Sequence, residues 1–172
     1  MKKVAVIGAG PGGYVAAIRL AQLGADVHLV ERDRVGGTCL NRGCIPTKTL
    51  FRTAEIMHEM KHAHDFGIDA SPAKVDYDKL VERKEKVVDT LVGGIEQLIK
   101  SYPNIRFHVG TAHILEKDKI EVKANTETCA SAGGEGACCS SGGAAGEIID
   151  GLDAVIIANG SKPQMTETQG VE

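Results

Sequence analysis

Long apolar segments are missing from this sequence. No run among its 172 residues approaches the roughly 20 apolar residues that cross a membrane. Two lysines precede an apolar stretch near the start, but Gly8, Gly10, Gly12 and Gly13 interrupt it before it reaches the length of a signal-peptide core. We therefore expect a cytoplasmic protein without a membrane partner, in which cysteines serve redox chemistry and are not structural staples.

A strong charge imbalance is missing too. The chain has 20 basic and 23 acidic residues, with a formal net charge of −3. Proteins that bind nucleic acid carry clustered basic residues, so this balance gives no case for a nucleic-acid partner. The hydrophobic content of 42% and the length suit a single folded core.

A dinucleotide-binding pattern is present at the start of the chain. The β-branched run at 4–7 leads directly into Gly8, Gly10 and Gly13, in the order G-x-G-x-x-G. Gly8 permits a tight turn, Gly10 lets the backbone approach a pyrophosphate, and Gly13 allows the next helix to pack closely on the strand. That helix is predicted over 15–23, and its N-terminus favours bound phosphate.

The next segment completes this pattern. Gly24 is suited to end the helix, and residues 27–30 form a second apolar strand that leads into Glu31. A carboxylate at this distance from the glycines can accept hydrogen bonds from a ribose. Strand, turn, helix, strand and acidic residue occur in order, which favours dinucleotide binding over a simple glycine-rich turn.

Two cysteines follow, Cys39 and Cys44, in the segment Gly-Gly-Thr-Cys-Leu-Asn-Arg-Gly-Cys-Ile-Pro-Thr-Lys. Residues five apart in a regular helix have Cα atoms about 8.6 Å apart, whereas a disulfide tolerates at most about 6.8 Å. If these cysteines bridge, the segment must be distorted, and Asn41 and Gly43 tolerate unusual backbone angles. Pro46 suits the first turn of a new helix, which places Cys44 near a helix N-terminus, an environment that makes thiols reactive.

This segment resembles the FAD-dependent pyridine nucleotide-disulfide oxidoreductases, and within them the dihydrolipoamide dehydrogenase branch. Glutathione and mercuric reductases share its core, but Leu40 and Ile45 favour the lipoamide branch. The resemblance covers residues 1 to about 124 and resumes at about 148 to 163. It implies a Rossmann-like α/β FAD-binding domain with a parallel sheet, flanking helices and a small antiparallel hairpin or meander.

The resemblance also implies roles for individual residues. Cys44 resembles the thiol nearest the flavin, Cys39 the interchange thiol, and Lys48 a lysine near flavin N5. Asn159 stands where the family usually has threonine, which puts that flavin contact in doubt. The residues implied to bind FAD are Gly8, Gly10, Pro11, Gly13, Glu31, Arg32, Gly37, Thr38, Cys39, Cys44, Lys48, Ala112, Asn159 and Gly160.

The implied activity is oxidation of protein-bound dihydrolipoamide through a Cys39–Cys44 disulfide and FAD, with reduction of NAD to NADH. Lipoyl domains of 2-oxo acid dehydrogenase or glycine cleavage complexes are the implied partners, and the full-length protein is implied to be a homodimer.

A full subunit of this family is longer, with an NAD-binding domain and an interface domain. We therefore expect residues 1–172 to be an N-terminal part of an FAD-binding domain, inactive alone. A glutathione- or mercuric-reductase-type enzyme and an FAD-binding module without turnover are the alternatives.

The remaining chain contains further periodic segments. Helices are predicted over 47–64 and 76–102, strands over 105–109 and 153–158, and a hairpin from 113–115 and 119–122. The apolar spacing predicts buried faces at Leu50, Ala54, Met57 and Lys61 in the first helix, and at Leu80, Val87, Leu91, Ile95, Leu98 and Ile99 in the second.

Residues 125–147 are low in complexity and are predicted to be a solvated insertion between hairpin strands. A soft-metal or regulatory thiol cluster at Cys129, Cys138 and Cys139 is the alternative. Their spacing fits no zinc signature, and adjacent cysteines rarely ligate one tetrahedral ion. We therefore expect no metal site here.

One rival motif points to a zinc hydrolase. His58 and His62 form H-E-x-x-H on a predicted helix, a spacing that places two imidazoles on one face. The extended metzincin pattern fails, because Asp65 and Ile68 stand where glycine and histidine are needed. An ordinary solvated helix face is the favoured interpretation.

Overall fold

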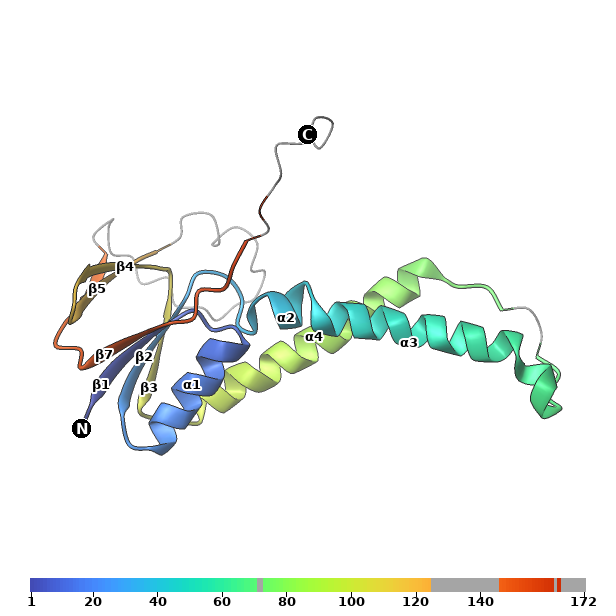
Figure 1. The fold of residues 1–172 in the computed structure, drawn as a ribbon, viewed down its shortest axis with the longest axis horizontal. Helices are drawn as coiled ribbons and strands as arrows, with labels where there is room; N and C mark the ends of the chain where they lie inside the picture. Colours follow the sequence, from blue (N-terminus) through green and yellow to red (C-terminus); the bar gives the residue numbers. More distant parts are fainter. Residues whose placement is uncertain (71–72, 125–145, 163, 165–172) are drawn as a thin grey trace, which may run out of the picture.

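A parallel sheet forms the centre of the computed structural model, which describes residues 1–70, 73–124, 146–162 and 164. Its strand order is β3-β2-β1-β7, and a second, antiparallel sheet has the order β4-β5-β6 (Figure 1). The strands are β1 (Lys3–Ile7), β2 (Asp26–Glu31), β3 (Ile105–Val109), β4 (Thr111–Glu116), β5 (Lys119–Lys123), β6 (Glu147–Ile149) and β7 (Ala154–Ile157). The predicted fold class, a parallel α/β sheet with flanking helices and a small antiparallel meander, is confirmed.

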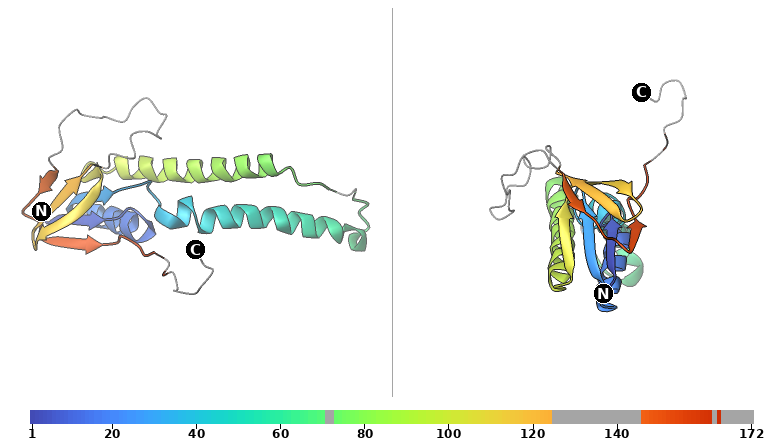
Figure 2. Two further views of the ribbon diagram at one scale, coloured as in Figure 1. Left: turned by 90° about the horizontal axis from the view of Figure 1, so that it is seen from above. Right: turned by 90° about the vertical axis from the view of Figure 1, so that its left-hand side faces the viewer.

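One helix connects β1 to β2, and a longer series of helices connects β2 to β3. They are α1 (Pro11–Gln22), α2 (Gly37–Asn41), α3 (Cys44–Lys61), the short 3₁₀ helix η1 (Ala63–Phe66) and α4 (Tyr77–Lys100). Gly24 adopts a φ of +81° directly after α1, as its predicted role as a helix stop requires. The helices α3 and α4 lie side by side and extend beyond the sheets, α3 leading away and α4 returning (Figure 2).

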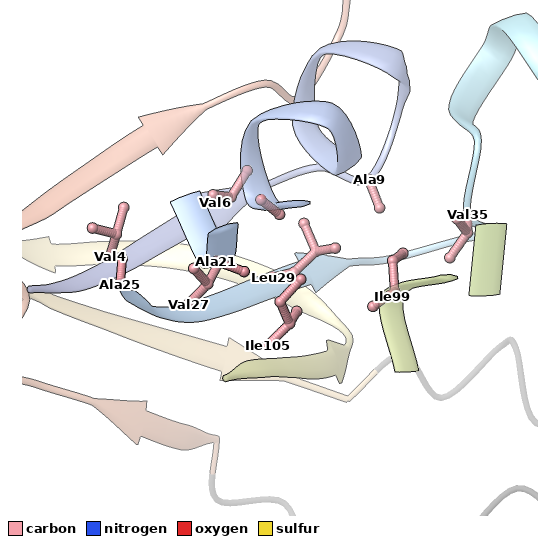
Figure 3. Packing of buried hydrophobic residues seen from close by; sticks show 11 residues of the cluster. Val4, Val6, Ala9, Ala21, Ala25, Val27, Leu29, Val35, Ile99 and Ile105 are labelled. Carbon is pink, nitrogen blue, oxygen red and sulfur yellow. The ribbon is translucent and has the colours of Figure 1, made fainter. Parts of the chain in front are cut away.

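Two apolar layers hold the sheets in place. On one face of the parallel sheet, Val6, Val27 and Leu29 pack with α1 and with Ile99 of α4 (Figure 3). The opposite face packs against the meander, and this layer contains Ala5, Val30, Ile120, Val122, Ile149 and Leu152. Covering on both faces explains why the strands β1 and β2 are nearly continuous apolar runs.

The buried face predicted for α3 is wrong. Leu50 is 39% exposed and Ala54 is exposed, whereas Thr49 is buried. The helix packs along one side against α4, so most of its circumference has no neighbour in the described residues. Apolar spacing identified residues suited to burial, but it did not identify which side of the helix would be covered.

The stripe predicted for α4 is only partly confirmed. Ile99 is buried as expected, but Leu91 and Leu98 are 41% and 45% exposed. Val88 and Val92, which the prediction missed, are buried instead. These valines pack with Leu40 of α2, so the covered face is set by the segment that contains Cys39.

The predicted insertion over 125–147 lies mostly outside the described residues, as do Cys129, Cys138 and Cys139. The predicted end of this insertion, residue 147, is wrong, because Glu147 is the first residue of β6. This strand pairs with β5 in antiparallel register, with Val122 opposite Glu147 and Ile120 opposite Ile149. The hairpin is therefore part of a three-stranded meander.

None of the helices in the described ranges combines the length and the hydropathy needed to span a bilayer.

A pair of histidines, His28 buried and His108 half-buried, links the parallel sheet to Glu147 of the meander. His28 of β2 is 4% exposed, and its Nδ1 lies 3.0 Å from Nε2 of His108 in β3. On its other side, Nε2 of His28 lies 3.2 Å from the guanidinium of Arg106. Arginine can only donate, so His28 Nε2 accepts and its Nδ1–H donates to His108. His108 Nδ1 in turn lies 2.9 Å from Glu147 of β6.

The surroundings of His28 favour its neutral form. Burial lowers its pKa from 6.5 to about 4, and His108, Lys3 and Arg106 act in the same direction. The carboxylate of Asp26 acts in the opposite direction. A proton on Nε2 would point at the Arg106 guanidinium, which adds to the larger effect of burial against the charged form.

We predict that His28 makes the fold sensitive to acid. Because its pKa is lower when folded, the unfolded chain binds the extra proton, and stability is lost as the pH falls from 6.5 towards 4. The full contribution is on the order of 3 kcal/mol. Urea unfolding of wild type and His28→Leu between pH 7.5 and 4.5 measures this, and the variant should lose much of the dependence. An unchanged dependence would contradict the assignment.

Candidate active site

The predicted site residues gather at the edge where the parallel strands end. Gly8 follows β1, Glu31 ends β2, Ala112 lies just after β3, and Asn159 follows β7. Parallel strands of a doubly wound sheet bind ligands outside their carboxyl ends. The chain order therefore brings residues more than 150 positions apart to one edge (Figure 1).

The first glycine turn is built by backbone contact. Gly8 has a φ of +99°, and a Cβ there would lie 2.4 Å from the carbonyl oxygen of Ala158. A Cβ at Gly13 would lie 1.7 Å from the carbonyl oxygen of Gly8. Only hydrogen fits at these positions, so the start of α1 rests directly on the end of β1.

A second close contact joins this turn to the cysteine segment. Gly37 has a φ of +56°, and a Cβ there would lie 2.9 Å from Cα of Gly10. The backbone N–H of Gly36 also donates to the carbonyl oxygen of Ala9 at 2.8 Å. The glycine turn and the start of α2 are thus in backbone contact.

The N-terminus of α1 carries no side-chain cap. Gly10 is its N-cap residue and Pro11 its first residue, and the first turn contains no acidic side chain. Free N–H groups at a helix start favour an anion, because they donate hydrogen bonds and carry the positive end of the dipole.

Glu31 is held firmly beside the glycine turn. Its Oε2 accepts from the N–H of Ala9 at 2.7 Å, and its Oε1 accepts from the N–H groups of Arg32 and Asp33 at 2.9 and 3.0 Å. A carboxylate offers about four acceptor positions, so one more donor can be accommodated. The sequence suggested a ribose contact here, but not these three backbone bonds.

The two cysteines lie on either side of a break between two helices. Cys39 lies within α2, and Cys44 is the first residue of α3. A Cβ at Gly43 would lie 3.0 Å from the carbonyl oxygen of Thr38, so this glycine lets α3 begin close against α2. The predicted distortion is present, but at Asn41 the backbone is helical, and no described residue other than glycine has a positive φ.

Both cysteines are free thiols, Cys39 partly buried and Cys44 exposed. A hydrogen bond to the thiol of Cys44 raises the pKa of Cys39, and burial adds to this effect. Lys48 lies four residues after Cys44 in α3, and its ammonium group acts to lower the pKa of Cys39. The break between α2 and α3 therefore brings the two cysteines together, with Lys48 one helical turn beyond Cys44.

The other predicted contacts line the same edge. Arg32 follows Glu31, and Thr38 is exposed beside Cys39. Ala112 pairs with Val122 and is half-buried against the meander layer. Gly160 has a φ of +73° and nothing within 4 Å of a Cβ built on it.

Two features of the site were missed at the sequence level. Leu40 packs with Val88 and Val92 of α4, and Cys39 packs against this cluster. The side-chain amide of Asn41 donates to two backbone carbonyls in the same segment. The spacing of Val88 and Val92 along α4 could have indicated the packing around Leu40. No local pattern in the sequence indicates the hydrogen bonds of Asn41.

The rival zinc motif forms only the expected ring pair. The imidazoles of His58 and His62 lie with their centroids 4.6 Å apart on the exposed side of α3. Within the described part of the chain, no group of three or more histidine, cysteine or acidic residues is placed to hold a metal ion.

Substitution at Gly13 tests the close packing of the glycine turn. We expect Gly13→Ala to lower the free energy of unfolding by more than about 3 kcal/mol, because its Cβ would overlap the Gly8 carbonyl. Gly12→Ala is the matched control, since nothing lies within 4 Å of its Cβ. It should change stability by no more than about 1 kcal/mol. Urea unfolding of both variants measures the difference, and equal effects would contradict the packing.

Removal of Cys44 should make Cys39 more reactive at moderate pH. The Cys44 hydrogen bond is the main cause that raises the pKa of Cys39, so in Cys44→Ala this pKa should fall. The pH profile of Cys39 alkylation by iodoacetamide, followed by peptide mass spectrometry, should then shift to lower pH. A shift to higher pH would show that the thiols do not interact as described.

Comparisons with known proteins agree with this arrangement. The family model described as pyridine nucleotide-disulphide oxidoreductase matches residues 2–172. A dihydrolipoyl dehydrogenase from Halobacterium salinarum is 50% identical over 119 residues, which cover 69% of this chain and 25% of that protein. One from Bacillus subtilis is 39% identical over 162 residues, 93% of this chain and 31% of that protein. The chain thus spans about a quarter to a third of the length of these curated relatives.

A solved structure shows the same fold. The HOCl-induced flavoprotein disulfide reductase RclA from Escherichia coli, as its Cu(II) complex, superposes with a TM-score of 0.68 at 24% identity, covering 96% of this chain and 30% of that one. The match of the family model over almost the entire sequence, together with a dithiol beside a glycine turn, shows that this chain belongs to the pyridine nucleotide-disulphide oxidoreductase family.

Proposed function

We propose that this chain supplies the FAD-binding and dithiol part of a dihydrolipoamide dehydrogenase. The observation that carries the proposal is the contact between Gly10 and Gly37, which sets the dithiol segment against the nucleotide turn. The curated relatives named dihydrolipoyl dehydrogenase support the choice of substrate class. In this proposal residues 1–172 belong to an FAD-binding domain, and NAD binds elsewhere in the complete enzyme.

The residues present fit FAD in three respects. A Cβ built on Gly10 has only the Cα of Gly37 within 4 Å, at 3.8 Å, so the missing side chain leaves room for a ligand beside this backbone. The uncapped start of α1 suits a pyrophosphate. The carboxylate of Glu31 keeps room for one donor, such as a ribose hydroxyl. Arg32, Thr38, Lys48, Ala112, Asn159 and Gly160 are proposed to complete the contacts around the cofactor.

The chemistry of the cysteine pair is dithiol–disulfide exchange. A thiolate of the dihydrolipoyl group attacks the sulfur of Cys39, which breaks the Cys39–Cys44 bond, forms a mixed disulfide and releases Cys44 as a thiolate. The second substrate thiolate then closes the lipoyl disulfide and releases Cys39. FAD, held by the glycine turn and Glu31, would supply the two-electron acceptor that returns the pair to the disulfide, and NAD would be the final acceptor in the complete enzyme.

The chain's own groups prepare this exchange. Gly43 lets the two cysteines approach, and Leu40 with Val88 fixes the helix that carries Cys39. Lys48 favours the thiolate form of Cys39, which is the group released when the lipoyl disulfide closes. Lipoyl domains of 2-oxo acid dehydrogenase or glycine cleavage complexes are the proposed partners, in a homodimeric cytoplasmic enzyme.

The visible spectrum of the chain with FAD tests the proposal. We expect bound flavin to gain a long-wavelength absorbance band when a mild dithiol reduces the cysteines, because the Cys44 thiolate would contact the flavin. Cys44→Ser should lose this band. Cys39→Ser is the matched control and should show it without reductant.

The outcomes separate the possible errors. A band that persists in Cys44→Ser would overturn the assignment of the flavin-side thiol. Bound flavin without any band in either the reduced wild type or Cys39→Ser would leave an FAD-binding module and contradict the redox role. A chain that retains no flavin after FAD is added would contradict the cofactor proposal for this chain.

A further inference from the structure

We propose that Asn41 is a positioning residue for the Cys39–Cys44 pair, because its side-chain amide fixes α2 in the conformation in which the two sulfurs meet. This inference rests on the proposed redox role of the pair. Asn41 has no part in the chemistry itself. It acts through the backbone of the segment that carries Cys39.

The amide of Asn41 makes two hydrogen bonds. Its Nδ2 donates to the carbonyl oxygen of Gly37 at 2.9 Å and to that of Val35 at 3.0 Å. Val35 is 2% exposed and lies in the connection between β2 and α2, away from any strand ladder. The last residue of α2 is therefore tied to the first residue of the helix and to the buried Val35 just before it.

The orientation of this amide is set by its acceptors. Turning it over would place Oδ1 against two carbonyl oxygens, so Nδ2 must face them. In this orientation Oδ1 is buried and has no hydrogen-bond partner among the described residues. A buried unpaired oxygen is unfavourable, because it loses its hydrogen bonds to water. A leucine of similar size would avoid that cost, so what the amide adds is the pair of bonds to Gly37 and Val35.

These bonds control where α2 ends. The helix has only five residues, too few to be stable without tertiary support. Its last backbone bond runs from the N–H of Arg42 to the carbonyl oxygen of Thr38 at 2.9 Å, and α3 begins at Cys44. A continued helix would separate the two cysteines beyond disulfide reach, as the roughly 8.6 Å spacing shows. The two hydrogen bonds from Asn41 keep α2 from continuing into α3, so the break between Asn41 and Cys44 is maintained.

The apolar anchor of α2 does not replace this tie. Leu40 packs on Val88 and Val92, which fixes one side of the helix against α4. Apolar contact is not directional, so it leaves rotation and fraying at the last turn of α2 unrestrained. The two amide bonds are directional and act on the backbone next to Cys39. Loss of the amide should therefore change the thiol geometry while the helix stays docked.

The redox equilibrium of the pair tests this role. The chain is equilibrated without flavin in buffers of reduced and oxidised dithiothreitol, the thiols are trapped, and the Cys39–Cys44 peptide is quantified by mass spectrometry. We expect Asn41→Leu to shift the dithiol–disulfide equilibrium about tenfold towards the dithiol. Asn41→Ser, which keeps one donor, should shift it less and covers the case in which the leucine variant does not fold.

Asn104 offers a matched control in the same chain. Its Nδ2 also donates to two backbone carbonyls, those of Ala21 at 2.9 Å and Ala25 at 2.7 Å, near the opposite end of α1. Asn104→Leu should lower stability towards urea as Asn41→Leu does, yet leave the cysteine equilibrium unchanged. This separates positioning of the thiols from a general structural effect.

Each outcome has a distinct meaning. If the wild type forms the Cys39–Cys44 bridge and both folded Asn41 variants keep its equilibrium, the positioning role is overturned and the proposed function stands. A shift of equal size in Asn104→Leu would overturn it as well. If the wild type never forms the bridge at any ratio of the buffer, the proposed function fails and the inference fails with it.

Discussion

Direct backbone contact at glycine is the constraint on which the rest of the site depends. Gly13 rests on Gly8, Gly8 rests on Ala158, and Gly37 rests on Gly10. These contacts leave no room for side chains. They place the start of α1 directly against the ends of β1 and β7, and the start of α2 directly against the glycine turn. The start of α1 and the cysteine segment therefore meet at one edge, because no side chain separates them.

Much of the fold could be predicted because its signals are local. The segments at 4–7 and 27–30 became buried parallel strands, and 105–109 became the parallel edge strand β3. Gly8 and Gly24 mark a turn and a helix end, and both roles could be stated from the sequence, whereas Gly43 was expected only to tolerate unusual backbone angles. The cysteine segment was likewise recognisable from its residues alone.

The features that could not be predicted depend on distant neighbours. The covered face of α4 is set by Leu40 of α2, about fifty residues away in sequence, so periodicity alone favoured Leu91 and Leu98 over Val88. The protonation state of His28 depends in the same way on residues of β3. Asn41 was noticed for its backbone tolerance, whereas its contribution comes from its side chain. Such contacts leave no periodic trace in a sequence.

The pairing of β1 with β7 has a consequence for the order of folding. The backbone N–H of Lys3 bonds to the Asp153 carboxylate across 150 residues, and the strand Ala154–Ile157 closes the edge beside β1. During synthesis on the ribosome, β1 can pair with β2 early, but its other edge stays open until nearly the whole described chain has emerged. An open strand edge is a template for wrong pairing. This edge of β1 is therefore vulnerable to wrong pairing until β7 arrives.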